Sequence, residues 1–174
     1  MLKQLSGFPS LVPALITKVN ITQVNDIGKI HTGSHETHYA VNDGTIETVP
    51  GFEPAFKAKV VFGADWFRVD PDGNHARIDL RGIARSENGH TIDFRAAGVV
   101  DMTTEIRKIL SGDPGAATIP FGSITASHTF LVADPTMKIF ENGIFVSNTR
   151  FITSSTGIIV ETRQSLVVAS TDMD

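Results

Sequence analysis

The sequence predicts an all-β protein, built as a single closed antiparallel β-barrel with one short helix. Turn motifs of the Asn-Gly and Asp-Gly type recur along the chain of 174 residues, between runs rich in Val, Ile, Thr and Phe. Short turns join the long strands into a meander, and closing such a sheet removes the edges that would otherwise bind other chains. The length fits one domain, which we place at residues 1–174.

The turns and strands can be placed by residue number. The turns centre on Asn42-Asp43-Gly44, Asp70-Pro71-Asp72-Gly73, Glu87-Asn88-Gly89, Glu141-Asn142-Gly143 and Ser155-Thr156-Gly157. The long strands are expected at Ala14–Val24, Ala55–Phe62, Asp65–Val69, His75–Ser86, His90–Val100, Ile124–Ala133, Ile144–Thr153 and Gly157–Ala169. Shorter strands are expected near residues 30–31, 37–41 and 45–49.

One segment departs from the strand pattern. After Asp101, a residue type that caps helices, apolar side chains repeat at helical spacing, and Gly112 with Asp113-Pro114 ends the repeat. The repeating residues are Met102, Ile106, Ile109 and Leu110. We therefore expect one helix over Met102–Ser111.

Composition argues against several classes of partner. Lys and Arg number 15 against 19 Asp and Glu, for a formal net charge of -4, whereas nucleic-acid binding needs a basic patch. No apolar run approaches the roughly 20 residues of a membrane helix, and Met1–Val24 lacks the pattern of a secretion signal. The chain has no cysteine, which excludes disulfides and suits a reducing compartment. We expect a cytoplasmic protein that binds neither nucleic acid nor membranes.

The turn at Glu87-Asn88-Gly89 defines the two faces of one hairpin. Glycine at the third position fits a type I turn followed by a left-handed residue, which pairs Ser86 with His90. The resulting apolar face pairs Ala84 with Ile92, Gly82 with Phe94 and Leu80 with Ala96, and the charged face carries Arg77, Asp79, Arg81, Asp93 and Arg95. This charged face is either an outer surface in contact with water or, if the sheet is turned the other way, the wall of a cavity.

Part of the sequence resembles a family of small β-barrel proteins catalogued as a domain of unknown function, DUF3237. The resemblance is tight from Lys57 to Gly98 and rests on Gly63-Ala64-Asp65-Trp66, Pro71-Asp72-Gly73 and Ala76-Arg77-Ile78-Asp79-Leu80-Arg81. Further along, Asp134-Pro135 and Phe140-Glu141-Asn142 resemble an Asp-Pro followed by Trp-Leu-Asn in the family, with Phe140 and Glu141 replacing Trp and Leu. The region from His31 to Pro54 resembles fungal-type members. The resemblance implies a lipocalin-like or allene-oxide-cyclase-like barrel, often oligomeric, without an established general activity.

Ionisable residues near this region suggest acid–base chemistry in a barrel lumen. We expect catalytic roles for Asp65, His38, Asp79 and Arg81, and ligand-binding roles for Trp66, Arg68, Tyr39, Asp93, Arg95 and Asn142. Asp65 or His38 would act as the base, while an arginine would stabilise the negative charge that develops on the substrate. The structural alternatives are that Trp66 belongs to the core and that Asp65 bonds backbone amides at a bulge.

Three of the six histidines lie close together, at His31, His35 and His38. They raise the possibility of a metal site, but Gly33-Ser34 favours a turn or strand, in which these side chains do not share one face. The segment also lacks the H-E-x-x-H pattern. We therefore expect no metal.

The sequence carries no phosphate-binding loop, dinucleotide fingerprint or G-x-S-x-G motif, so no organic cofactor is expected either. The resulting hypothesis is a cofactor-independent isomerase, cyclase or dehydratase that acts on a small hydrophobic metabolite of polyketide or terpenoid type. The alternatives are a barrel that binds a small molecule without catalysis and a structural subunit. Apolar runs at Ile158-Ile159-Val160 and Leu166-Val167-Val168 predict a homodimer.

Overall fold

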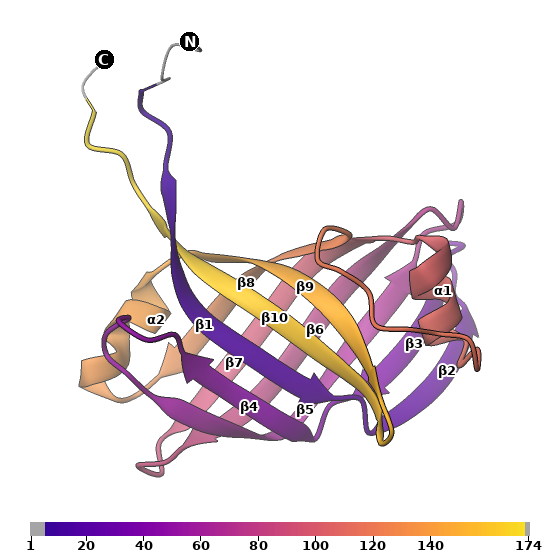
Figure 1. Cartoon of the computed structure of the whole chain (residues 1–174), viewed down its shortest axis with the longest axis horizontal. Coiled ribbons are helices and arrows are strands. Elements are labelled where there is room, and N and C mark those ends of the chain that lie inside the picture. Colours follow the sequence, from indigo (N-terminus) through magenta and orange to yellow (C-terminus); the bar gives the residue numbers. More distant parts are fainter. Residues whose placement is uncertain (1–5, 173–174) are drawn as a thin grey trace.

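The chain forms a ten-stranded antiparallel sheet that closes into a barrel, seen in a computed structural model that describes residues 6–172. The first and last residues of the predicted 1–174 domain, including the start of Met1–Val24, lie outside the described residues. The strands are β1 (Ser10–Asn20), β2 (Gln23–Lys29), β3 (His35–Ala40), β4 (Asp43–Thr48), β5 (Lys57–Val69), β6 (His75–Ser86), β7 (Thr91–Asp101), β8 (Ile124–Val132), β9 (Phe145–Ser154) and β10 (Gly157–Val168). Eight strands form the ring in the order β5-β4-β1-β10-β9-β8-β7-β6, and pairing of β6 with β5 closes it (Figure 1). The predicted fold class is confirmed.

β2 and β3 extend the sheet beyond the ring. β4 pairs with the first residues of β5, whereas β3 pairs with its second half, from Ala64 to Val69. β2 pairs with β3 alone. The second half of β5 therefore lies between β3 and β6, and this is the part of the ring that carries Asp65.

A β-bulge in β5 decides which of its residues face the lumen. The register with β6 shifts between Val60 and Phe62, where β5 carries one extra residue. Phe62 consequently faces solvent, and the alternation of the strand resumes with the opposite phase. Asp65 enters the lumen as a result, whereas Trp66 lies on the outer surface, 37% exposed.

The β6–β7 hairpin has the predicted register. The backbone N–H of Ser86 donates to the carbonyl of His90 at 2.9 Å, and Gly89 adopts a left-handed φ of 84° in the turn between them. The apolar face points into the barrel and includes the pair Gly82–Phe94. A Cβ at Gly82 would lie 2.3 Å from the ring of Phe94, so the absence of a side chain there makes room for that ring.

Short helices cover the two ends of the barrel (Figure 1). At one end α1 (Thr104–Leu110) buries Ile106 and Ile109 in an apolar cluster. At the other end η1 (Pro135–Met137) and α2 (Lys138–Asn142) contribute to a second cluster. Within residues 6–172, no helix is long and apolar enough to cross a membrane.

The helix expected over Met102–Ser111 is confirmed as α1, with a start two residues later. Thr103 is the capping residue, because its hydroxyl accepts the N–H of Ile106 at 3.3 Å. The helical segment at η1 and α2 was not predicted. Asp134 caps it by accepting the N–H of Thr136, but a five-residue helix is too short to show a helical repeat in the sequence.

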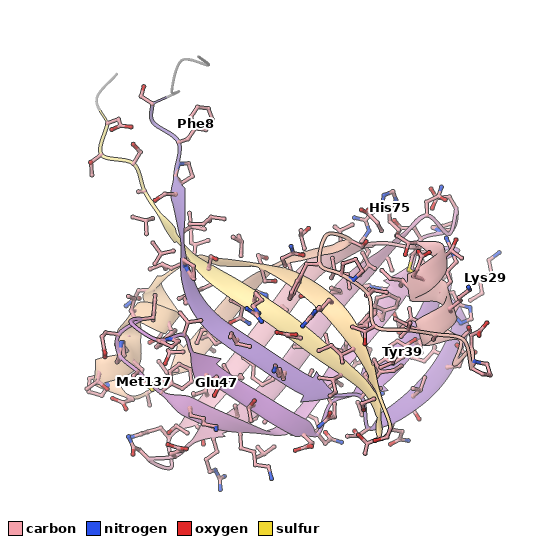
Figure 2. All side chains as sticks on the ribbon, viewed as in Figure 1. Phe8, Lys29, Tyr39, Glu47, His75 and Met137 are labelled. Atoms are coloured by element: carbon pink, nitrogen blue, oxygen red, sulfur yellow. The ribbon has the colours of Figure 1, made fainter. Side chains whose placement is uncertain are left out.

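β1 and β10 leave the barrel side by side and bring the described ends of the chain together (Figure 1). Phe8, labelled in Figure 2, is exposed on this ribbon, as are Leu11, Val12 and Val168. Half of the residues in the apolar runs from which a dimer was predicted are turned inward: Ile158, Val160 and Leu166 pack against the two clusters. The exposed apolar surface in this part of the molecule therefore belongs to the ribbon.

Candidate functional site

A cavity of about 80 Å³ lies inside the barrel, between the two apolar clusters. Its wall is mainly apolar, with Leu80 and Phe94 among the lining residues. The polar lining residues are Thr17, Tyr39, Asp65, His128, Thr149, Thr162 and Gln164. Among the described residues, no lysine or arginine lines this space. The cavity can hold a few water molecules or a small, largely apolar ligand.

Asp65 is the acidic group of this cavity. Its carboxylate Oδ1 accepts a hydrogen bond from the backbone N–H of Asp79 at 2.9 Å, so the structural role considered from the sequence is present. Burial among apolar side chains raises the pKa of Asp65 to about 7, and outweighs the lowering effect of that hydrogen bond. Near neutral pH the carboxyl group is present in both protonation states, which allows it to donate and to accept protons.

Tyr39 lies directly opposite Asp65 in the β3–β5 pair. Its buried ring packs edge-on against Phe67, with 5.7 Å between the ring centroids. Burial and the negative charge of Asp65 raise the pKa of Tyr39 above its ordinary value of 10.0. The phenol therefore stays protonated at neutral pH and can donate a hydrogen bond. Figure 2 shows Tyr39 toward the end of the barrel that α1 covers.

A chain of hydrogen bonds crosses the wall formed by β8, β9 and β10. His128 places Nε2 2.7 Å from the Ser147 hydroxyl, and its Nδ1 lies 3.3 Å from the amide nitrogen of Gln164. That nitrogen also donates to the Thr17 hydroxyl at 3.2 Å. Burial lowers the pKa of His128 to about 4, so the ring is neutral at pH 7. Nδ1 then accepts from Gln164 while Nε2–H donates to Ser147.

This polar wall faces Asp65 across the lumen. β9 is four strands away from β5 in either direction around the ring, which places the two strands on opposite sides. Both walls line the same cavity. A ligand in the barrel can therefore contact a carboxyl group on one side and a neutral polar chain on the other.

The charged face of the β6–β7 hairpin lies outside the barrel, so the hypothesis that it lines the lumen is wrong. Asp79 and Arg81 form a surface pair at 3.5 Å, and Asp93 and Arg95 form another at 2.9 Å. The apolar face fills the interior, and strand alternation then forces these charges into water. The expected arginine in the lumen is consequently absent. Asp79 acts on the cavity from outside, through its backbone N–H and through its negative charge, which helps to raise the pKa of Asp65.

Three other expected residues occupy the outer surface of β3 and β5. His38 packs against Trp66 in an edge-to-face contact, with 5.1 Å between the ring centroids. Arg68 lies 3.9 Å from carboxylate oxygens of Glu36 and Asp79. Because the bulge turns Trp66 outward, this side chain neither lines the lumen nor belongs to the core, and both expectations for it are wrong.

Asn142 lies at the end of α2 and is exposed. It does not line the cavity. Of the residues expected at the site, the structure brings Asp65 and Tyr39 together in the lumen and leaves the others outside it.

The histidine-rich segment does not assemble a metal site in the structure. His35 Nε2 lies 2.5 Å from a carboxylate oxygen of Asp26, and His38 contacts Trp66 and Asn25 instead. In the part of the chain that the structure describes, no three His, Asp or Glu side chains gather closely enough to hold a metal ion.

Sequence reasoning missed His128 and Gln164. Both alternate with inward-facing residues on their strands, Ala126 and Phe130 around His128, and Thr162 and Leu166 around Gln164. This period of two would have placed both side chains on the inner face of a barrel. A single histidine at an inward position of the β8 segment, between small and apolar neighbours, could have indicated a polar group in the lumen.

The family model described as "Protein of unknown function (DUF3237)" matches residues 9–167. No relative was found among curated proteins.

Several solved structures have similar folds at low sequence identity. A beta-barrel like protein from Acinetobacter baumannii is 17% identical with a TM-score of 0.70, covering 95% of this chain and 99% of its own. A conserved protein of unknown function from Rhodopseudomonas palustris is 16% identical with a TM-score of 0.76, covering 94% and 100%. An enzyme from Penicillium herquei is 14% identical with a TM-score of 0.54, covering 95% and 99%. At such identities these likenesses show the fold.

Proposed function

The chain belongs to the DUF3237 family of proteins of unknown function, and within that family we propose that it is a cofactor-independent acid–base enzyme. The proposed reaction is an isomerisation, cyclisation or dehydration of a small hydrophobic metabolite, of polyketide or terpenoid type, inside the barrel. In support, one neighbour with this fold is an enzyme from Penicillium herquei. From the resemblance of the His31–Pro54 region we also propose that the chain is a fungal-type member.

The observation that carries the proposal is the carboxyl group of Asp65, partly buried in the wall of the lumen, whose pKa is raised to about 7. A general acid or base works best when its pKa is close to the working pH, because both forms are then available. Asp65 would remove a proton from one carbon or oxygen atom of the ligand and return it to another, so no oxidant, reductant or co-reactant is needed. The ligand alone changes its bonding.

In the proposed reaction Tyr39 stabilises the developing negative charge, a role that the sequence analysis assigned to an arginine. A protonated phenol next to Asp65 can donate a hydrogen bond to an oxygen on which negative charge develops as the proton leaves. In a cavity with few competing polar groups such a bond is stronger than in water. Asp65 moves the proton, and Tyr39 stabilises the charge left behind.

The second candidate is a barrel that binds a small molecule without converting it. The small and predominantly apolar cavity supports this candidate, because such a cavity is sufficient to bind a small molecule and binding requires no reactive group. The two candidates differ in what they require of Asp65. Catalysis needs its ionisable oxygen, whereas binding is served equally by a neutral amide of the same shape.

The test compares wild-type protein with Asp65→Asn and with Asp93→Asn, a matched change on the outer surface of the barrel. Each is incubated with a small-molecule extract of the source organism, and mass spectrometry records compounds that are consumed and replaced by an isomer or a dehydrated product. Conversion by wild type and Asp93→Asn, with at least a hundredfold loss in Asp65→Asn, is the expected result. Equal conversion by all three proteins contradicts the assignment of Asp65. A compound that binds to wild type but remains unchanged favours the non-catalytic barrel.

Two further proposals concern the state of the protein in the cell. A homodimer is proposed on the exposed apolar side chains of the β1–β10 ribbon, which include Phe8 and Leu11. A cytoplasmic location is proposed on the complete lack of cysteine.

A further inference from the structure

One buried hydrogen-bond acceptor in the polar wall has no partner. Gln164 is 4% exposed, and its amide nitrogen already donates to Thr17 and to His128. Its side-chain oxygen Oε1 is buried and lacks a hydrogen bond to any of residues 6–172. Buried polar atoms in folded proteins are nearly always paired, because an unpaired one has lost its water without a replacement. The oxygen therefore marks a position where a bound molecule would complete the hydrogen bonding.

A hydroxyl donor stands next to this acceptor. Thr162 lies two residues before Gln164 on β10, so both side chains project from the same inner face. The hydroxyls of Thr162 and Thr149 are 3.0 Å apart, and one of their two protons makes the bond between them. The second proton is available to a ligand. The same inner face of β10 thus offers an acceptor and, two residues away, a donor.

The charges around the cavity restrict which polar group can bind there. No lysine or arginine among the described residues lines the space, and the pKa of His128 lies far below neutrality. Asp65 can add only negative charge. A carboxylate or phosphate would therefore lose its hydration without meeting a cation, whereas a neutral hydroxyl group would meet both an acceptor and a donor.

We propose that Gln164, with the Thr149–Thr162 pair, forms a subsite for the hydroxyl group of a small neutral alcohol or phenol. The ligand hydroxyl donates to Oε1 of Gln164 and accepts from the free threonine proton. This holds the polar end of the ligand on the wall opposite Asp65, and leaves its apolar part in the middle of the lumen. The subsite rests on the proposed function for the location of the ligand, but it does not require Asp65 to transfer a proton.

Three matched fluorinated probes test the subsite by 19F NMR titration of the full chain. They are 4-fluorophenol, 4-fluorotoluene, which replaces the hydroxyl with a methyl group, and 4-fluorobenzoate, which carries a negative charge. We expect the phenol to bind wild type at least tenfold more tightly than the benzoate. The preference for phenol over toluene should fall at least fivefold in Gln164→Met, which keeps the length of the side chain but removes its oxygen. Asp65→Asn should change this preference less than twofold.

The proposal is overturned if Gln164→Met keeps the wild-type preference, if the benzoate binds as tightly as the phenol, or if wild type binds no probe at millimolar concentration. Should Gln164→Met fail to fold, the side-chain amide signals of Gln164 in wild type give the answer. They must shift on addition of phenol and stay in place on addition of toluene. Loss of turnover in Asp65→Asn with the phenol preference intact supports both proposals. An intact preference without any turnover contradicts catalysis alone.

Discussion

Two ionisable side chains face each other across the lumen, Asp65 on β5 and His128 on β8, and the same apolar surroundings shift them in opposite directions. Burial disfavours the charged form of each, so the pKa of the carboxyl group rises to about 7 while that of the imidazole falls to about 4. His128 is then fully neutral at pH 7. Asp65 remains balanced between its two forms.

This difference separates a reactive wall from a binding wall. A group that is half protonated near neutral pH can transfer a proton, whereas a group locked in its neutral form can only donate and accept hydrogen bonds. The hydrogen-bonding partners agree with that division. Asp65 has one bond to a backbone N–H, while His128 is held on both ring nitrogens by Ser147 and Gln164.

The largest expected effect on stability is that of Asp65→Asn in alkaline solution. The pKa of Asp65 is about 7 in the folded protein and about 3.8 in the unfolded chain, so the folded state binds more protons between these values and loses stability as the pH rises through them. Asparagine can keep the bond to the N–H of Asp79 without ever becoming charged. At pH 8 we expect Asp65→Asn to be more stable than wild type by about 4 kcal/mol.

Urea unfolding of both proteins at pH 8 and at pH 4 measures this difference. The difference in the free energy of unfolding should shrink toward zero at pH 4. At that pH the carboxyl group is protonated in the folded state, and about half of the unfolded molecules also carry it protonated. Asp93→Asn serves as the control on the outer surface, and should stay within about 1 kcal/mol of wild type at both pH values. A variant Asp65→Asn that is less stable than wild type at pH 8 would show that the carboxylate is not desolvated.

His128→Gln should reveal the opposite slope on the other wall. The pKa of His128 is about 4 when folded and about 6.5 when unfolded, so wild type loses stability from this residue as the pH falls from 6.5 to 4. Over the same range Asp65 gains stability, and the two contributions nearly cancel. Glutamine cannot be protonated. Relative to wild type, the variant should therefore gain about 3 kcal/mol between pH 7 and pH 4.

The measurement is again urea unfolding, across the acid range, with the double variant Asp65→Asn, His128→Gln as control. The double variant should follow the pH dependence of wild type, because the opposing contributions of the two groups disappear together. If His128→Gln runs parallel to wild type from pH 7 to pH 4, His128 is not buried in its neutral form, and the contrast between the walls fails.

The sequence predicts those parts of the site that depend on neighbouring residues, and misses those that depend on contacts between distant parts of the chain. The register of the β6–β7 hairpin follows from one glycine in one turn, and the division into an apolar and a charged face follows from the register. Which of those faces points inward depends on the closure of the whole ring. The inward position of Asp65 depends on a single extra residue at Val60–Phe62, which simple alternation does not reveal. The polar wall is harder still, since Thr17 and Gln164 are brought together from the two ends of the chain.

The smallest expected effect is on the ionisation of Tyr39, and it tests whether the carboxyl group of Asp65 acts at short range within its own wall. The chain contains a single tyrosine, so the ultraviolet absorbance of ionised phenol during an alkaline titration reports Tyr39 alone. Burial and the charge of Asp65 raise the pKa of Tyr39 above 10.0 in wild type. In Asp65→Asn the contribution of the Asp65 charge vanishes while those of burial and of the Asp26 charge remain, so the pKa should move down toward 10.0 without reaching it. His128→Gln, on the opposite wall, should leave the titration unchanged, and circular dichroism at each pH must show that the fold persists. An equal shift in both variants would mean that the two walls share one electrostatic environment, and the division into a reactive and a binding side would have to be given up.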